Sequence, residues 1–175
     1  MKLLKKLCNH IFIDGLSGMA LGLFATLIIG TILSQIGTLL KGEIGANLNA
    51  ASNIAKTLTG AGIGVGVACK FKASPLVTIS ATVAGMIGAF PSAASMDSLS
   101  LGKPGEPLGA FVAALAAIEL GQLISGRTKI DIIITPFLSI GSGAIVGFLV
   151  GPPITKFMNF IGTLVNVNVQ QHPII

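Results

Sequence analysis

Long apolar runs separated by short polar links make up most of this chain. Residues 15–36 contain no charged side chain. Their number matches the roughly 20 residues that an α-helix needs to cross the hydrocarbon core of a bilayer. We therefore predict a membrane-spanning helix here. Asp14 directly precedes the run, where a carboxylate complements the positive end of a helix, so capping is its expected role and proton or ion binding the alternative.

Four further runs have a pattern that predicts spanning helices, and they cover residues 44–69, 75–96, 108–124 and 132–150. The first of these is the least uniform, because Asn47, Asn49, Asn53 and Lys56 are set against its apolar positions. We expect that helix to face protein or water on one side. Pro91 in the second run and Pro136 in the last are expected to bend or break their helices.

Amphipathic segments flank these runs at both ends. In the N-terminal MKLLKKLCNHIF, leucines share one helical face and lysines the other. In residues 154–165, Phe157, Ile161 and Leu164 oppose a more polar face. Gly151-Pro152-Pro153 precedes this second segment and is predicted to end the last spanning helix, because proline cannot continue the hydrogen-bond ladder. Both segments are therefore expected to lie on the membrane surface.

Composition supports a membrane environment. Hydrophobic residues make up 52% of the chain and charged residues 10%, with a mean hydropathy of +0.89, whereas a soluble domain carries about 25% charged residues. So few charges cannot cover a water-facing surface. The pattern and composition predict an all-α polytopic membrane protein, in which residues 1–175 form one membrane domain. It would have about five transmembrane helices, with N- and C-terminal amphipathic surface helices.

The basic residues predict an orientation rather than a nucleic-acid partner. The net charge is +5 and the pI about 9.5, but the lysines and arginine lie in small groups at the ends of apolar runs, without interleaved aromatic residues. A cytoplasmic N-terminus followed by five spans places most of them inside, as the positive-inside rule requires. The inner group is Lys2, Lys5, Lys6, Lys70, Lys72, Arg127 and Lys129, and the outer group is Lys41, Lys103 and Lys156.

Glycines recur at every second position in TGAGIGVGVACK, at Gly60, Gly62, Gly64 and Gly66. A nucleotide-binding loop is disfavoured, because neither the Gly-x-Gly-x-x-Gly spacing nor a following Lys-Ser/Thr pair is present. Small residues let helices in a membrane approach closely, so we predict helix packing through these glycines. Gly143 and Gly147 in the last run are predicted to pack in the same way.

Chemistry-bearing motifs are absent from the sequence. Cys8 and Cys69 match no metal-ligand spacing, and the two histidines, His10 and His172, lie far apart. No catalytic residue, metal site or cofactor is predicted. Glu119 stands out because an ionisable side chain within a span is costly. It could bind sugar hydroxyls or a cation, carry a proton, or pair with Lys56 or an asparagine of the half-polar second helix.

Several of these stretches carry a family resemblance. TPFLSIGSGAIVGFLVGPPITKFMNFIGTLVN followed by HPII resembles the integral-membrane IIC component (EIIC) of bacterial sugar phosphotransferase systems. FIDGLSGMALGLFATLIIGTIL and GAGIGVGVACKFKASPLV are similar to the IIC-like branch that includes perfringolysin O regulator-type membrane proteins.

The resemblance implies a sugar permease of the bacterial cytoplasmic membrane. It implies that this chain corresponds to the N-terminal half, which forms scaffold and dimer interface, and that separate IIA and IIB components supply the phosphoryl group. The chain alone would then not be an enzyme. Because a glutamate and a histidine lie near the sugar in such permeases, Glu119 and His172 are candidate substrate-binding residues, although a loop role for His172 is favoured. A membrane-embedded regulator that has lost transport is the alternative function.

Overall fold

The computed structural model describes residues 9–92 and 100–171, and every secondary-structure element in these residues is helical. The first helix runs without interruption but changes its geometry along its length. Its segments are η1 (Asn9–Gly15), α2 (Leu16–Leu23), η2 (Phe24–Ile28) and α3 (Ile29–Leu40), of which η1 and η2 are π-helical. The prediction of an all-α protein is confirmed for the described part of the chain.

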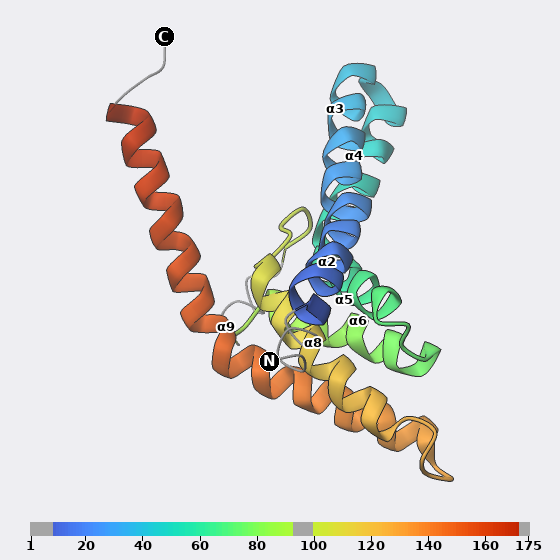
Figure 1. Ribbon diagram of the computed structural model, residues 1–175. Coiled ribbons are helices and arrows are strands. Elements are labelled where there is room, and N and C mark those ends of the chain that lie inside the picture. Colours follow the sequence, from blue (N-terminus) through green and yellow to red (C-terminus); the bar gives the residue numbers. More distant parts are fainter. Residues whose placement is uncertain (1–8, 93–99, 172–175) are drawn as a thin grey trace.

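Five more helices complete this part of the chain, and they are α4 (Gly42–Thr57), α5 (Thr59–Lys70), α6 (Pro75–Ala89), α8 (Pro107–Ile124) and α9 (Asp131–Gln171). Figure 1 shows a bundle formed by α2, α5, α6, α8 and the first half of α9. Two arms leave this bundle. One is the antiparallel pair α3 and α4, and the other is the second half of α9.

Three helices are long and apolar enough to cross a membrane: His10–Leu40, Pro107–Ile124 and Asp131–Val167. They contain three of the five predicted spans. A single helix over residues 44–69 is wrong, because Leu58, with ψ of 14°, separates α4 from α5. The run 75–96 contains α6, which has 15 residues and is shorter than a typical span; residues 93–99 lie outside the described part.

The prediction that Gly151-Pro152-Pro153 ends a helix is also wrong, because α9 continues through both prolines. A proline ring crowds the Cβ and N–H of the residue before it as well as the carbonyl four residues earlier. Gly151 has no Cβ, which relieves the first of these clashes for Pro152. Each proline still removes a backbone donor, which favours a bend. Figure 1 shows α9 changing direction partway along its length. Residues 154–165 therefore belong to α9 and do not form a separate helix.

The predicted N-terminal surface helix lies mostly outside the described residues. Residues 1–8, which include most of the predicted N-terminal surface helix and Cys8, lie outside the described part of the chain. Its last residues, from Asn9 onward, begin the long first helix.

Close contacts between small residues hold the bundle together. Helix α5 lies between α2 and α6, and its alternating glycines point to the two sides in turn. The facing pairs are Gly60 with Gly85, Gly64 with Ala81, Gly62 with Gly22, and Gly66 with Gly18. A methyl group at any of the four α5 glycines would overlap a side chain or backbone of the neighbouring helix. Gly143 of α9 lies similarly against Ala84 of α6 and the backbone of α8 at Ala113.

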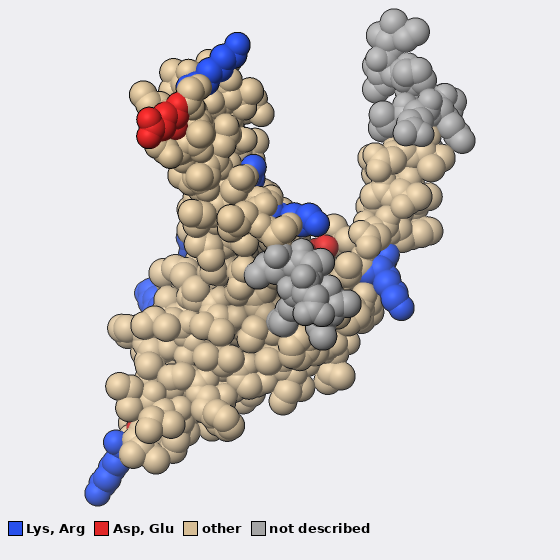
Figure 2. Space-filling view, turned by 180° about the vertical axis from the view of Figure 1, so that it is seen from behind, with Lys and Arg blue, Asp and Glu red and all other residues tan. Residues whose placement is uncertain are grey.

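The outer surface is mostly apolar. Figure 2 shows broad faces with few charged side chains, which lie mainly near the ends of helices and in the links between them. Large apolar side chains such as Phe24, Phe137 and Leu149 are exposed. Exposed apolar area on this scale is rare in soluble monomers and is expected where lipid tails are the solvent.

Two interhelical turns meet at one end of the bundle. The hydroxyl groups of Ser74, before α6, and Ser125, after α8, lie 3.0 Å apart. The Gln122 side-chain amide donates a hydrogen bond to the Phe71 carbonyl oxygen over 3.1 Å. The α5–α6 and α8–α9 links, with their basic residues Lys72 and Arg127, are therefore at the same end of the molecule.

Candidate functional site

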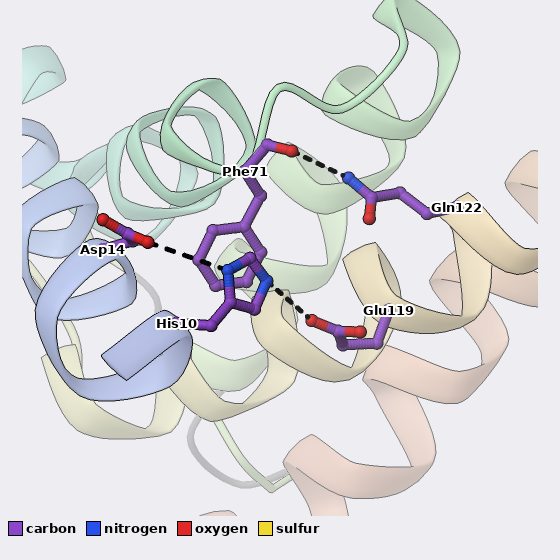
Figure 3. Close-up of polar contacts among 5 residues, drawn as sticks. All are labelled: His10, Asp14, Phe71, Glu119 and Gln122. Carbon is purple, nitrogen blue, oxygen red and sulfur yellow. Dashed lines mark hydrogen bonds and ion pairs between the residues drawn. The ribbon is translucent and has the colours of Figure 1, made fainter. Parts of the chain in front are cut away.

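A histidine between two carboxylates joins the first helix to α8 (Figure 3). His10 Nε2 lies 3.4 Å from Glu119 Oε1, and His10 Nδ1 lies 3.8 Å from Asp14 Oδ2. Asp14 is one turn further along η1, so this contact is within the helix, whereas the contact with Glu119 connects two helices. Protonation of the imidazole would give both carboxylates a positive partner.

Phe71 holds the imidazole in this position. Its ring stacks on that of His10, with the ring centroids 3.8 Å apart and the planes inclined by 24°. Phe71 follows α5 and is only 7% exposed, so the surface on which His10 rests is part of the core. The Gln122 bond to the Phe71 carbonyl fixes the same turn to α8. The start of the first helix, the turn after α5 and α8 are thus connected to one another by the His10–Phe71, His10–Glu119 and Gln122–Phe71 contacts.

The exposure of this cluster limits its chemistry. The side chains of His10, Glu119 and Asp14 are 39%, 49% and 56% exposed, respectively. Ion pairs this accessible to solvent contribute about 0–1 kcal/mol. No group of three or more His, Cys, Asp or Glu side chains in residues 9–92 and 100–171 is arranged to hold a metal ion. The geometry fits a link between helices better than a metal centre.

Comparison with known families identifies the chain. The family model described as "Phosphotransferase system, EIIC" matches residues 13–175. The chain belongs to this EIIC family. Comparison with curated proteins and with solved structures gave no match. The resemblance seen in the sequence is therefore confirmed at the level of the family, and the match includes Asp14, Phe71 and Glu119.

In this EIIC protein, Glu119 has a different partner from those expected. Neither Lys56 nor an asparagine of the half-polar segment contacts it in the described residues; His10 does. Lys56 lies in the α3–α4 arm, where its side chain packs over Gly30. No local sequence pattern pairs His10 with Glu119. The sequence did place His10 four residues before Asp14, a spacing that indicates a contact between these two side chains on one helix but not the contact with Glu119.

Asp14 does not cap the first helix. The described helix begins at Asn9, so Asp14 lies inside η1 and its carboxylate faces His10. The prediction failed because the helix extends beyond the apolar run towards the N-terminus. His172 lies outside the described residues, so its predicted contact with sugar stays a prediction. Cys69 is a free, exposed thiol at the end of α5.

Proposed function

We propose that this EIIC protein is the membrane permease component of a bacterial sugar phosphotransferase system. The family match over residues 13–175 carries this proposal, and the apolar candidate spans support a place in the membrane. IIA and IIB components would supply the phosphoryl group. This chain would contribute the scaffold and dimer interface around which a sugar-binding part moves.

The way polar groups are satisfied inside the bundle supports a membrane scaffold. In hydrocarbon, an unpaired polar group costs several kcal/mol, so hydroxyls on spanning helices bond to nearby carbonyls. Ser139 of α9 donates to the Ala117 carbonyl of α8, and Ser80 and Thr82 of α6 bond back to carbonyls of their own helix. The buried polar side chains among the described residues are thus serines and threonines, and the Ser139 bond joins α9 to α8.

Uptake by cells tests the proposed function. Deleting the intact gene should remove saturable, phosphoenolpyruvate-dependent uptake of at least one sugar in a radiolabelled panel, and re-expression should restore it. If uptake of every sugar in the panel is unchanged, the permease proposal is wrong. A change in transcript levels together with unchanged uptake would instead favour the membrane-embedded regulator.

The same assay separates the two roles considered for Glu119. We propose that Glu119 links α8 to η1 through His10 and does not bind sugar. Glu119→Gln should then leave the KM for sugar within about twofold of wild type, as should the control Glu43→Gln in the α3–α4 arm. Loss of a direct carboxylate–sugar contact would raise KM by about tenfold or more.

Labelling with a membrane-impermeant maleimide tests the proposed topology. We propose five membrane crossings, with α4–α5 and the region of α6 as the second and third, and a cytoplasmic N-terminus. In a protein with Cys8→Ser and Cys69→Ser, Lys41→Cys and Lys103→Cys should react in intact cells. Lys72→Cys and Thr128→Cys should react only after permeabilisation. Because Ser74 contacts Ser125, labelling of Lys72→Cys and Thr128→Cys from opposite sides would contradict both the topology and the fold.

A further inference from the structure

The α3–α4 arm packs chiefly on itself. Helices α3 and α4 contact each other along their length, and they adjoin the bundle through η2 and the start of α5. Figure 1 shows this pair extending away from the other helices. A self-contained pair of helices can move as one body if both connections to the bundle allow bending.

Both connections depart from α-helical geometry, and the two irregular segments lie beside each other, at the base of the arm. On the first helix, the irregular segment is the π-helical η2. On the returning chain, it is Leu58, between α4 and α5. Thr26 of η2 lies against Gly62, one turn after Leu58, which places the two irregularities side by side. Irregular segments of this kind are where helices kink and bend.

Threonine hydroxyls donate hydrogen bonds to backbone carbonyl groups near η2 and Leu58. Thr26 donates to the Gly22 carbonyl over 2.7 Å, Thr57 to the Asn53 carbonyl over 2.7 Å, and Thr59 to the Lys56 carbonyl over 2.6 Å. Such bonds keep carbonyl groups paired when the regular ladder is interrupted. A bend here would therefore expose few unpaired backbone groups to lipid.

A third segment, residues 100–106, connects the base of the arm to the bundle. The Gly102 N–H donates to Thr57 Oγ1 over 2.8 Å and to the Asn53 carbonyl over 3.2 Å. Four residues later, the Glu106 N–H donates to the Ala89 carbonyl at the end of α6 over 2.8 Å. Residues 100–106 thus tie the base of α4 to α6. In residues 9–92 and 100–171, these hydrogen bonds restrain the arm in addition to its two helical connections.

We propose that the α3–α4 arm is a rigid lever that pivots at η2 and Leu58, and that residues 100–106 act as a clasp restraining the pivot. The inference is independent of what the protein transports. It requires that α3 and α4 keep their mutual packing while their angle to the bundle changes, and that the Thr57 hydroxyl contributes to the restraint.

Distances between spin labels test the pivot in the full-length protein in lipid nanodiscs, with Cys8→Ser and Cys69→Ser. One label pair joins the arm to the bundle, Glu43→Cys with Phe137→Cys. The control pair shares a site but stays within the bundle, Ile79→Cys with Phe137→Cys; all three positions are exposed. The arm-to-bundle distance distribution should be about twofold broader than the control, or should have two maxima.

Removing one hydroxyl tests the clasp. Thr57→Val should broaden or shift the arm-to-bundle distribution and leave the bundle pair unchanged. The matched control is Thr38→Val, because in the described part of the chain the Thr38 hydroxyl donates to the Ser34 carbonyl of its own helix. This control should change neither distribution. An arm-to-bundle distribution as narrow as the control pair and unaltered by Thr57→Val would overturn the proposal. Broadening of the bundle pair by Thr57→Val would show general loosening and would overturn the assigned clasp.

Discussion

Gly64→Ala is expected to destabilise the protein by about 3 kcal/mol, lowering the midpoint of thermal unfolding in detergent by about 10 °C. The added methyl group would overlap the backbone of α6 at Ala81 and Thr82. Backbone cannot move aside as a flexible side chain can, so α5 and α6 would have to separate along their contact. Circular dichroism during heating, together with gel filtration, measures the change.

Gly141→Ala is the matched control for this prediction. Gly141 also lies within a helix, α9, but nothing approaches within 4 Å of the place where its Cβ would be. Alanine there should leave the midpoint unchanged or raise it, because alanine is favoured over glycine in a helix by up to about 1 kcal/mol. Equal effects of the two substitutions would show that the α5–α6 contact is not as close as described.

Phe71→Ala is expected to cost about 3–5 kcal/mol of unfolding free energy, because it removes a buried aromatic ring and leaves a cavity. It also removes the ring on which His10 stacks, so the contact between His10 and Glu119 of α8 should weaken and the start of the first helix should unfold locally more often. Thermal unfolding measures the first effect. Limited proteolysis near the N-terminus measures the second, and cleavage should become faster.

Two companion substitutions separate burial from stacking. Phe71→Leu retains most of the buried volume without an aromatic face, so it should lose less stability than Phe71→Ala yet still accelerate proteolysis. Phe137→Ala removes the same ring from an exposed position in α9, where the side chain is 75% exposed, and should change neither readout. If Phe137→Ala were as damaging as Phe71→Ala, the assignment of the core would be wrong.

The broad fold was predictable because membrane helices leave a strong local signal. Residues 15–36 and 108–124 lie within helices long and apolar enough to span, and both can be recognised without any neighbour. The break at Leu58 had no such signal. Leu58 lies between two stretches that both form helices. The break arises because α4 packs against α3 whereas α5 packs against α2. The continuation of α9 through Pro152 and Pro153 was likewise not predictable, because a pair of prolines usually ends a helix.

The candidate site was only half predictable. Glu119 was recognisable because a carboxylate is costly in an apolar run. Its partner was not, since His10 precedes the uncharged run 15–36 and lies beside Glu119 only through the packing of α2 on α5 and of α5 on α8. Contacts between residues far apart in the chain have no local pattern, and a histidine outside an apolar run has many possible roles.

The amino-acid sequence by itself determined the solvent, the helical class and the family of this protein, because hydrocarbon selects long uncharged helices whatever their arrangement. Tertiary structure alone decided which glycine faces which helix, that His10 meets Glu119 beside Phe71, and that the α3–α4 pair leaves the bundle at η2 and Leu58. These features depend on close approach between helices, which is set by the shapes of both partners and not by either run alone.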